Sequence, residues 1–369
     1  MARAINLARQ GLYTTHPNPR VGCLLVREGK VVGEGYHRRT GEPHAERNAL
    51  AVAGEAARGA TAYVTLEPCC HHGRTPPCTE GLIEAGVKRV VTAMRDPNPK
   101  VAGQGLEQLR HAGIDVAEGV MQPQAEALNP GYIKRMSRGL PYLRCKMAMS
   151  LDGRTAMASG ESQWITSPAA RADVQRLRAR SAAILTGIGT LLADDPSMNV
   201  RLSAAELGID ADLPAPHPVR VVLDPNLDTP SDAKMLGLPG PTLIVCSDEQ
   251  PMHGAALEAA GAQVAMLPGD RRRLDLPEVL GFLAAQEINE VLLESGATLA
   301  GAMLEQGLVD ELIIYLAPHL MGQDARGLFH LPGIQRMSER VELGITDLRQ
   351  VGPDIRITAV PVGSGEDGG

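Results

Sequence analysis

The stretch His44-Ala45-Glu46, with Pro68-Cys69 further along, decides how the first half of this sequence is interpreted. The spacing of apolar residues predicts a helix over His44–Gly54, so the histidine and the glutamate share its first turn. The run Thr61–Thr65 predicts a strand that ends shortly before the cysteine. We therefore expect an imidazole, a carboxylate and a thiolate to form one site where a helix begins and a strand ends.

Histidine and cysteine are common zinc ligands, and their spacing here suits a hydrolytic reaction. Zinc deaminases hold the metal with three protein side chains and leave the fourth position to the water that attacks a ring carbon. A glutamate that is not a ligand moves the proton to the departing amine. The pattern indicates a zinc-dependent deaminase in which His44 and Cys69 bind the metal and Glu46 is catalytic.

Spacing alone leaves the third zinc ligand open. The chain runs Cys69-Cys70-His71-His72-Gly73-Arg74-Thr75-Pro76-Pro77-Cys78, whereas the usual pattern has its second cysteine three residues after the first, at the position of His72. Cys70, His72 and Cys78 are all candidates, and Cys78 is favoured because a helix is predicted directly after it. The alternative interpretation is a structural zinc site, closed by a histidine of this run as fourth ligand.

Composition and charge restrict the class of protein. Aromatic residues make up 2% of the chain and the formal net charge is −7, so the stacking surface and positive potential of nucleic-acid-binding proteins are missing. No run of about 18 apolar residues predicts a membrane-spanning helix. From the clustered cysteines and the lack of an apolar leader segment, we expect a cytoplasmic enzyme that acts on a small molecule.

Strands and helices alternate along all 369 residues, and this length suggests two domains. We predict an α/β sandwich over residues 1–140, a second α/β domain over residues 141–362, and a disordered Gly-rich tail over residues 363–369. A single helical segment at Gln122–Ser137 precedes the boundary. In the second domain we expect strands at Tyr142–Met149, Ala182–Thr186, Val219–Leu223, Thr242–Val245, Glu290–Glu294, Glu311–Ala317 and Ile355–Val360, and helices at Pro168–Arg180, Leu276–Ala285 and Leu299–Gln306.

Two glycine-containing turns in the second half are candidate phosphate-binding sites. Gly187-Ile188-Gly189 follows a predicted strand but lacks the third glycine of the dinucleotide-binding fingerprint. Glu294-Ser295-Gly296-Ala297-Thr298-Leu299 joins a strand to a helix, and such a turn aims free backbone N–H groups at an anion such as a cofactor pyrophosphate. A plain helix N-cap formed by Ser295 or Thr298 explains the turn equally well.

Several longer motifs occur in a fixed order along nearly the whole chain. In the first half they are Thr15-His16-Pro17-Asn18-Pro19-Arg20-Val21-Gly22, Gly41-Glu42-Pro43-His44-Ala45-Glu46 and Leu66-Glu67-Pro68-Cys69 through Cys78. In the second half they are Ser150-Leu151-Asp152-Gly153-Arg154, Gly160-Glu161-Ser162-Gln163-Trp164-Ile165-Thr166, Ala193-Asp194-Asp195-Pro196 and Glu294-Ser295-Gly296-Ala297-Thr298-Leu299. With these motifs the sequence resembles the bifunctional riboflavin-biosynthesis deaminase/reductase family.

The resemblance implies a cytidine-deaminase-like α/β/α sandwich followed by a dihydrofolate-reductase-like α/β domain. The first domain would remove the 2-amino group of 2,5-diamino-6-(5-phosphoribosylamino)pyrimidin-4(3H)-one by hydrolysis. The second would use NADPH to reduce the ribosyl side chain, which gives 5-amino-6-(5-phosphoribitylamino)uracil. The motifs imply His44, Cys69 and Cys78 as ligands of a single Zn²⁺ and Glu46 as proton carrier. Cys70 departs from the family pattern, which has serine there.

Two residues of the first site have alternative explanations. Asn18 lies in a proline-bracketed loop, where its amide can bind the pyrimidine edge or serve only the turn. Arg74 offers a cation for the ribose phosphate, or is an ordinary solvated arginine.

For the reductase site, the resemblance implies separate sets of substrate and cofactor residues. The substrate residues are Ser162, Arg178, Met198, Arg201 and Glu294, with the two arginines suited to clamp a phosphate. The residues implied to line the NADPH site are Ala148, Trp164, Thr190, Asp194, Gly296, Ala297, Thr298, Leu299, Ala300, Gly301 and Ala302.

Lys146 and Asp194 are the ionisable groups to examine first for hydride transfer. Their alternative roles are structural, because Lys146 alternates with apolar neighbours on a strand and Asp194 belongs to a good turn sequence. Arg178 has a structural alternative as well, on the solvated side of its helix.

Two other functions compete with the bifunctional enzyme. One is a deaminase whose second domain is not catalytic, and Arg201, Glu294 and Gly296, present in this sequence, argue against it. The other is a nucleic-acid-editing deaminase, which the acidic balance disfavours. We further expect a small phosphorylated pyrimidine ribotide as substrate and a homo-oligomer without nucleic-acid or membrane partners.

Overall fold

The computed structural model describes residues 1–72, 76–248, 254–270 and 272–362, so Arg74 and the predicted tail at 363–369 lie outside the described residues. The chain divides into two compact units. The first holds Met1–Leu140 together with Ser203–Ala215, and the second holds Pro141–Leu202 and the chain from Pro216 onward. Ser203–Ala215 therefore packs with the first unit although its sequence position is within the second predicted domain. No helix in the described ranges is long and apolar enough to cross a membrane.

A five-stranded sheet forms the centre of the first unit, with the order β2-β1-β3-β4-β5. Its strands are β1 (Gly22–Arg27), β2 (Lys30–Tyr36), β3 (Thr61–Val64), β4 (Arg89–Thr92) and β5 (Asp115–Ala117). β1 is antiparallel to both neighbours, whereas β3, β4 and β5 are parallel. The predicted α/β/α sandwich is thus confirmed.

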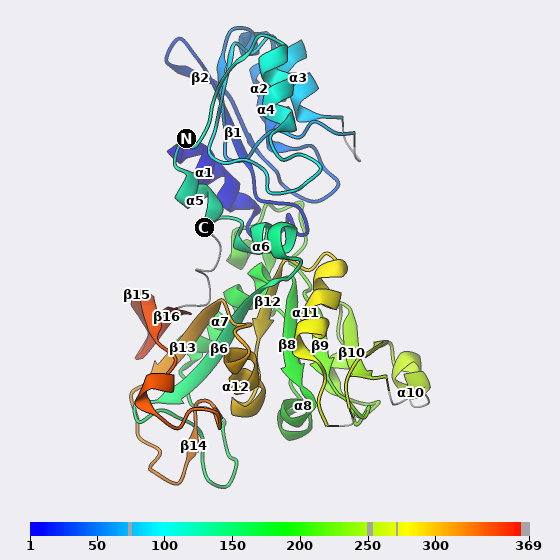
Figure 1. Ribbon diagram of the computed structural model, residues 1–369, viewed down its shortest axis with the longest axis vertical. Coiled ribbons are helices and arrows are strands. Elements are labelled where there is room, and N and C mark those ends of the chain that lie inside the picture. The colour runs from blue at the N-terminus through cyan, green and yellow to red at the C-terminus, as the bar shows by residue number, and fades with distance from the viewer. Residues whose placement is uncertain (73–75, 249–253, 271, 363–369) are drawn as a thin grey trace. The chain divides into compact units, whose positions relative to one another are not determined.

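Glycines bring helices into direct backbone contact with this sheet. A Cβ atom at Gly33 of β2 would lie 2.3 Å from the backbone oxygen of Ala49 in α2 (Ala45–Ala53). On the opposite face, a Cβ atom at Gly22 would lie 2.0 Å from the backbone oxygen of Ala4 in α1 (Ala2–Ala8). Helices therefore cover both faces (Figure 1). The remaining helices of this unit are α3 (Cys78–Glu84), α4 (Gln104–His111), α5 (Gln122–Glu126), α6 (Pro130–Arg138) and α9 (Ala204–Leu207), with short 3-10 turns at Arg9–Gly11 and Gly54–Ala57.

The prediction of one helix over Gln122–Ser137 is wrong, because α5 and α6 are separated by a break at Asn129. This residue has φ −129° and ψ 40°, outside the helical range. The next residue is Pro130, and proline disfavours the helical conformation in the residue before it. The break turns the Asn129 side chain toward the backbone of Arg20, where it accepts a hydrogen bond at 2.7 Å and donates one at 2.9 Å.

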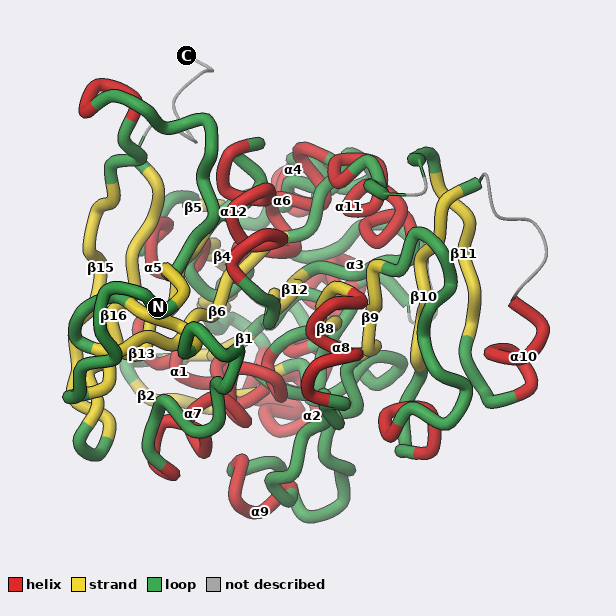
Figure 2. The backbone as a smooth tube through the Cα atoms, turned by 90° about the horizontal axis from the view of Figure 1, so that it is seen from below, coloured by secondary structure: helices red, strands yellow, loops and turns green. Residues whose placement is uncertain are grey.

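A nine-stranded sheet forms the second unit, with the order β11-β10-β9-β8-β12-β6-β13-β16-β15. Both backbone views place β10 at one end and β15 and β16 at the other, and Figure 2 shows β11 beside β10 (Figures 1 and 2). All strands from β11 to β13 are parallel, and the last two are antiparallel. The strands are β6 (Tyr142–Ser150), β8 (Ala183–Gly187), β9 (Val219–Leu223), β10 (Thr242–Ser247), β11 (Gln263–Leu267), β12 (Glu290–Leu293), β13 (Glu311–Ala317), β15 (Leu343–Val351) and β16 (Asp354–Pro361); β7 (Arg154–Ala156) and β14 (Arg326–Gly327) pair separately.

The connections of this sheet diverge between β8 and β12. From β8 the chain continues through α8 (Ile188–Asp194) to β9 on one side, and from β12 it continues through α12 (Ala297–Glu305) to β13 on the other. Ligands of open α/β sheets bind at such a divergence, outside the carboxyl ends of the strands. The other helices are α7 (Pro168–Arg180), which packs on Leu292 and Ile313, α10 (Gly254–Ala259) and α11 (Leu276–Ala285), with 3-10 turns at Lys234–Gly237 and Met337–Glu339.

Several elements of the second unit differ from the predictions. α12 begins at Ala297 rather than Leu299, and neither α8 nor β11 is predicted. β15 is missed because it is an edge strand exposed along most of its length, so its apolar residues do not alternate.

We expect Gly22→Ala to destabilise the first unit, because the added methyl group would overlap the backbone of α1. Overpacking of this kind costs about 1–3 kcal/mol. Differential scanning calorimetry would show a lower Tm. Gly281→Ala in α11 is the matched control, since a Cβ atom there meets nothing within 4 Å. An unchanged Tm for Gly22→Ala would contradict the close packing.

Candidate active sites

His44, Cys69 and Cys78 come together between the starts of α2 and α3 and the loop that follows β3, the middle strand of the first unit's sheet. The Nδ1 atom of His44 lies 3.5 Å from the Sγ atom of Cys69 and 3.4 Å from that of Cys78. One ligand atom from each of the three residues lies within 4.8 Å of the others, and this is the only such group of potential metal ligands within the described ranges. One imidazole and two thiols fit a zinc ion with an open fourth position, so the donor set suits a catalytic zinc.

Two of these residues come from the starts of helices, and Cys69 comes from the loop after β3. His44 is the N-cap of α2 and makes no side-chain cap hydrogen bond, which leaves its ring available. Cys78 begins α3, and its backbone N–H donates to the Sγ atom of Cys69 at 3.3 Å. Hydrogen bonding from the Cys78 thiol, with help from His44, lowers the pKa of Cys69, which favours the thiolate that binds zinc.

A buried glutamate holds the loop that carries Cys69. The carboxylate of Glu67 accepts hydrogen bonds from the backbone N–H groups of Asp96, Gly103 and Gly105 at 2.9–3.1 Å. A Cβ atom at Gly105 would lie 2.2 Å from the carbonyl oxygen of Pro68, so the start of α4 is in contact with this loop. Sequence reasoning missed Glu67, whose only signal is its place beside Pro68-Cys69.

The two competing ligand candidates lie elsewhere. His72 is paired with Glu80 at 3.8 Å, and its side chain is 73% exposed. Cys70 is half-buried, and burial raises the pKa of its thiol. Neither side chain belongs to the group formed by His44, Cys69 and Cys78.

Glu46 lies in the first turn of α2 and is buried, with 3% of its surface exposed. Burial raises its pKa to about 7, and the negative charge of Cys69 adds to this rise. A carboxyl group with this pKa exchanges a proton readily near neutral pH.

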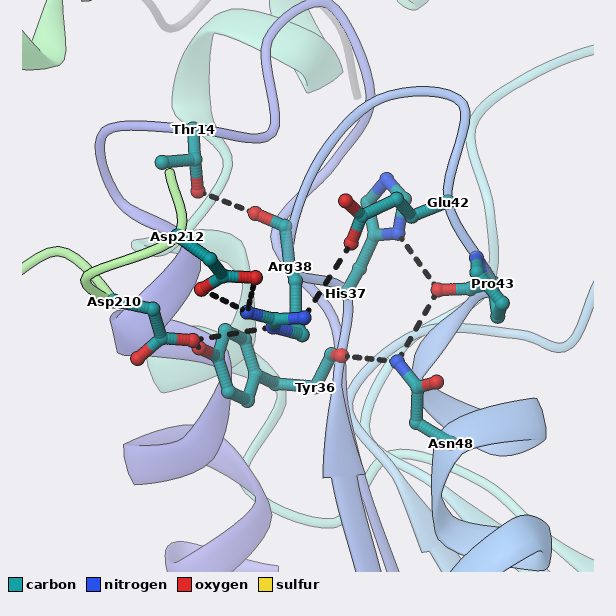
Figure 3. Close-up of polar contacts among 9 residues, drawn as sticks. All are labelled: Thr14, Tyr36, His37, Arg38, Glu42, Pro43, Asn48, Asp210 and Asp212. Carbon is teal, nitrogen blue, oxygen red and sulfur yellow. Dashed lines mark hydrogen bonds and ion pairs between the residues drawn. The ribbon is translucent and has the colours of Figure 1, made fainter. Parts of the chain in front are cut away.

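A second histidine, which sequence reasoning missed, lines the same site. The His37 ring contacts the His44 ring edge-on at a centroid distance of 5.3 Å. Burial lowers the pKa of His37 to about 4, so the ring is neutral. Its Nδ1 atom faces the carbonyl oxygen of Pro43 at 3.2 Å and therefore carries the proton (Figure 3). Its Nε2 atom then accepts from the Asn18 amide at 3.0 Å, which leaves the Asn18 oxygen as an acceptor for a ligand.

In the second unit, Glu294 follows β12 and forms a mostly buried two-pronged ion pair with Arg178 of α7. The Nε and Nη2 atoms of Arg178 lie 2.6 and 3.0 Å from the two carboxylate oxygens. The Nζ atom of Lys146, from β6, lies 3.8 Å from the Oε2 atom of Glu294. Burial alone would raise the pKa of Glu294, but Arg178 and Lys146 outweigh it and lower the pKa to about 2. Three residues of the predicted reductase site thus meet at the divergence of the sheet.

Other predicted substrate residues lie around this ion pair. The Nη1 atom of Arg178 donates to the carbonyl oxygen of Asn199 at 3.0 Å. The backbone N–H of Arg201 donates to the buried Gln175 at 2.9 Å, while the Arg201 side chain is exposed. Met198 is buried in a strained backbone conformation with φ +43°. Ser162 is half-buried.

The predicted cofactor residues divide into those at a helix start and those inside the fold. Gly296 is the N-cap of α12, and no side chain caps the first turn of this helix by a hydrogen bond. The alternative of a Ser295 or Thr298 cap is therefore wrong. This uncapped start at the sheet divergence suits an anion such as the NADPH pyrophosphate. Gly301 has another role, because a Cβ atom there would lie 2.0 Å from the backbone oxygen of His330.

The remaining cofactor candidates are spread over nearby elements. Thr190 and Asp194 lie on α8, and Asp194 accepts from Gln163 at 3.4 Å. The Trp164 ring is 69% exposed and stacks under Arg171 at 4.5 Å. Ala148 is half-buried on β6, and of the α12 residues Thr298 is exposed, Ala300 is buried, and Ala297, Leu299 and Ala302 are half-buried.

Two family models match the chain. The model described as the cytidine and deoxycytidylate deaminase zinc-binding region matches residues 1–94. The model described as the RibD C-terminal domain matches residues 141–357, which is more than half of the chain.

Whole proteins match over nearly their full length. The riboflavin biosynthesis protein RibD of Escherichia coli is 52% identical over 358 residues, 96% of each chain, and that of Haemophilus influenzae is 48% identical over 366 residues, 98% of this chain and 97% of the relative. Among solved structures, RibD of Acinetobacter baumannii aligns with a TM-score of 0.89 at 45% identity, over 98% of this chain and 97% of that one. A deaminase/reductase from Thermotoga maritima aligns with a TM-score of 0.83 at 31% identity, over the same shares. The chain belongs to the RibD family of riboflavin biosynthesis proteins, with a deaminase domain of the cytidine-deaminase type and a RibD reductase domain.

Proposed function

We propose that this chain carries out two consecutive steps of riboflavin biosynthesis, one in each unit. The first is the hydrolytic deamination of 2,5-diamino-6-(5-phosphoribosylamino)pyrimidin-4(3H)-one. The second is the NADPH-dependent reduction of the ribosyl side chain, which gives 5-amino-6-(5-phosphoribitylamino)uracil. The observation that carries the proposal is the presence of both sites in one chain. One is a His-Cys-Cys group with a buried glutamate, and the other is a mostly buried Glu-Arg-Lys group at a sheet divergence.

In the deaminase site, His44, Cys69 and Cys78 would hold zinc, which supplies a water of lowered pKa for attack on the ring carbon. Glu46 takes the proton from this water and gives it to the departing amine, a role that its pKa near neutrality supports. Asn18 presents its amide oxygen to an N–H group of the pyrimidine, because His37 engages the amide nitrogen. Product formation releases ammonia.

In the reductase site, bound NADPH would be the source of the hydride for C1′ of the ring-opened, imine-like ribosyl group. Glu294 stays ionised, and its carboxylate orients Arg178 and attracts the ammonium group of Lys146. Lys146 is the group nearest to this carboxylate that can deliver the proton balancing the hydride. The start of α12 at Gly296 and the residues of α8 would bind the cofactor.

The structure changes the role that we assign to Arg178. The three guanidinium nitrogens of Arg178 hydrogen-bond to Glu294 or to the backbone of Asn199, so this side chain is already engaged. The exposed Arg201 side chain is the better candidate for the substrate phosphate. Homo-oligomerisation, the lack of nucleic-acid and membrane partners, and a cytoplasmic location stay predictions.

The alternative of a deaminase with a non-catalytic second domain is not favoured. A decayed site would not keep a buried carboxylate paired with two cations, because an unpaired buried charge is costly.

The purified protein should contain about one zinc ion per chain, and Cys78→Ser should lose most of it because the metal keeps only two strong ligands. Inductively coupled plasma mass spectrometry measures the zinc content. Cys70→Ser and His72→Ala are the controls and should retain zinc. Loss of zinc in His72→Ala together with retention in Cys78→Ser would move the third ligand to His72.

Glu46→Gln should lower the rate of ammonia release by about 10²–10⁴-fold, because the amide cannot carry the proton. The same variant should reduce the deaminated substrate at the wild-type rate, followed by the absorbance of NADPH. Glu80→Gln, which changes an acidic residue in α3, is the control. A folded Glu46→Gln protein that loses reduction as well would overturn the two-site assignment.

Glu294→Gln should destabilise the second unit by about 3 kcal/mol, because the buried Arg178 loses its partner. The pKa of Glu294 is lowered from 4.5 to about 2, so the ion pair stabilises the fold fully above pH 4.5 and loses this effect as the pH falls through 2. The difference in Tm between variant and wild type should therefore be equal at pH 7 and about pH 5.5, and smaller below about pH 4. A difference that grows on acidification would contradict the assigned pKa.

A further inference from the structure

A short segment from the reductase half of the sequence belongs to the deaminase unit. Ser203–Ala215 lies within the match to the RibD C-terminal domain, yet it packs with Met1–Leu140. It starts with α9, which is closed by a capping box between Ser203 and Glu206, and it buries Leu207, Ile209 and Leu213. We call Ser203–Ala215 the acidic arm, because it also carries Asp210 and Asp212.

The two carboxylates of the acidic arm converge on one arginine (Figure 3). The Nη2 atom of Arg38 lies 2.7 and 2.8 Å from the two oxygens of Asp212, and its Nε atom lies 3.1 Å from Asp210. The hydroxyl of Tyr36 donates to Asp210 at 2.6 Å. A third carboxylate, that of Glu42, lies 3.9 Å from the Nη1 atom of Arg38. The acidic arm thus binds the side chains of Tyr36 and Arg38, the two sequence neighbours of His37.

The position of His37 between these two residues connects the arm to the deaminase site. In extended backbone, successive side chains point to opposite sides. Tyr36 and Arg38 reach the arm, and His37 reaches the other way, to His44 and Asn18. His37 is buried, whereas the Arg38 side chain is 33% exposed, so the arm acts on the outer side of a strand end whose inner side lines the site.

Further hydrogen bonds fix the same stretch of backbone. The Thr14 hydroxyl donates to the carbonyl oxygen of Arg38, and the Asn48 amide donates to the carbonyl oxygens of Tyr36 and Pro43 at 2.8 and 3.3 Å. A shift of Arg38 would therefore change the loop that runs from His37 to the metal-binding His44.

We propose that Asp210 and Asp212 are positioning residues of the deaminase reaction, which act through Arg38 and Tyr36 to set the place of His37 and Asn18. The proposal rests on the proposed deaminase function of this site. It makes pyrimidine binding in the first unit depend on residues encoded in the reductase half. The two aspartates touch neither the substrate nor the metal ligands.

The test uses the full chain with Asp210→Asn and Asp212→Asn combined. We expect the KM for deamination to rise about fivefold, near the upper limit for the loss of surface ion pairs, while kcat stays within about twofold. Zinc content and the rate of reduction of deaminated substrate should not change. Hydrogen exchange of the backbone amides of residues 37–43 should become faster.

Three further variants separate positioning from general stability. Arg38→Ala should raise the KM by the same factor, and adding it to the double variant should have no further effect, because the residues act as one unit. Asp212→Glu should restore most of the affinity. Asp115→Asn in β5, the other edge strand of the same sheet, removes an exposed ion pair with Arg89 of β4 and should leave the KM unchanged.

An unchanged KM in both the double variant and Arg38→Ala would overturn the proposal, and so would a loss of zinc or an equal effect of Asp115→Asn. If the wild-type chain itself released no ammonia, the proposed function would fail instead. The faster exchange of residues 37–43 would still show whether the arm holds this loop.

Discussion

The deaminase site depends on one constraint, the direct contact of α2 with β2. No side chain separates the two elements at Gly33 and Gly35, and the helix presents alanines to the strand. The contact places the start of α2, with His44 and Glu46, beside the end of β2, where His37 stands. A side chain at either glycine would lift the helix and move His44 away from the cysteines, which are held by other elements. The metal group is thus a consequence of backbone packing.

In the second unit the main constraint is the charge of Glu294, which lies inside an α/β fold and needs cationic partners. Glu294 lies at the point where the connections from β8 and β12 diverge, and two cations reach it from α7 and β6. Neighbouring parallel strands and the helix between them bring these residues together although they are far apart in sequence. An ion pair with two parallel hydrogen bonds has a fixed geometry, so it also fixes the site around it.

The parts of the fold and of the two sites that depend on residues close together in the sequence could be predicted. His44, Glu46 and Cys69 stand in a compact pattern, and the start of a helix at Cys78 favoured that residue over His72. His37 carries no such signal, because a lone histidine at a strand end is usually structural. The acidic arm could not be predicted, since Asp210 meets Arg38 across 172 residues. The break between α5 and α6 was predictable from Pro130, but the apolar periodicity concealed it.

The two buried glutamates show how one fold assigns opposite roles to the same side chain. Glu46 and Glu294 are both enclosed, and burial raises the pKa of either one. Around Glu46 the negative charge of Cys69 adds to the effect of burial, so the pKa stays near neutrality and the group can bind and release a proton. Around Glu294 the nearest charges are Arg178 and Lys146, and they reverse the shift. The first carboxylate is therefore suited to moving protons, and the second to staying charged while it orients its neighbours. A hydrolysis that transfers protons and a reduction that needs a fixed electrostatic field require this division of roles.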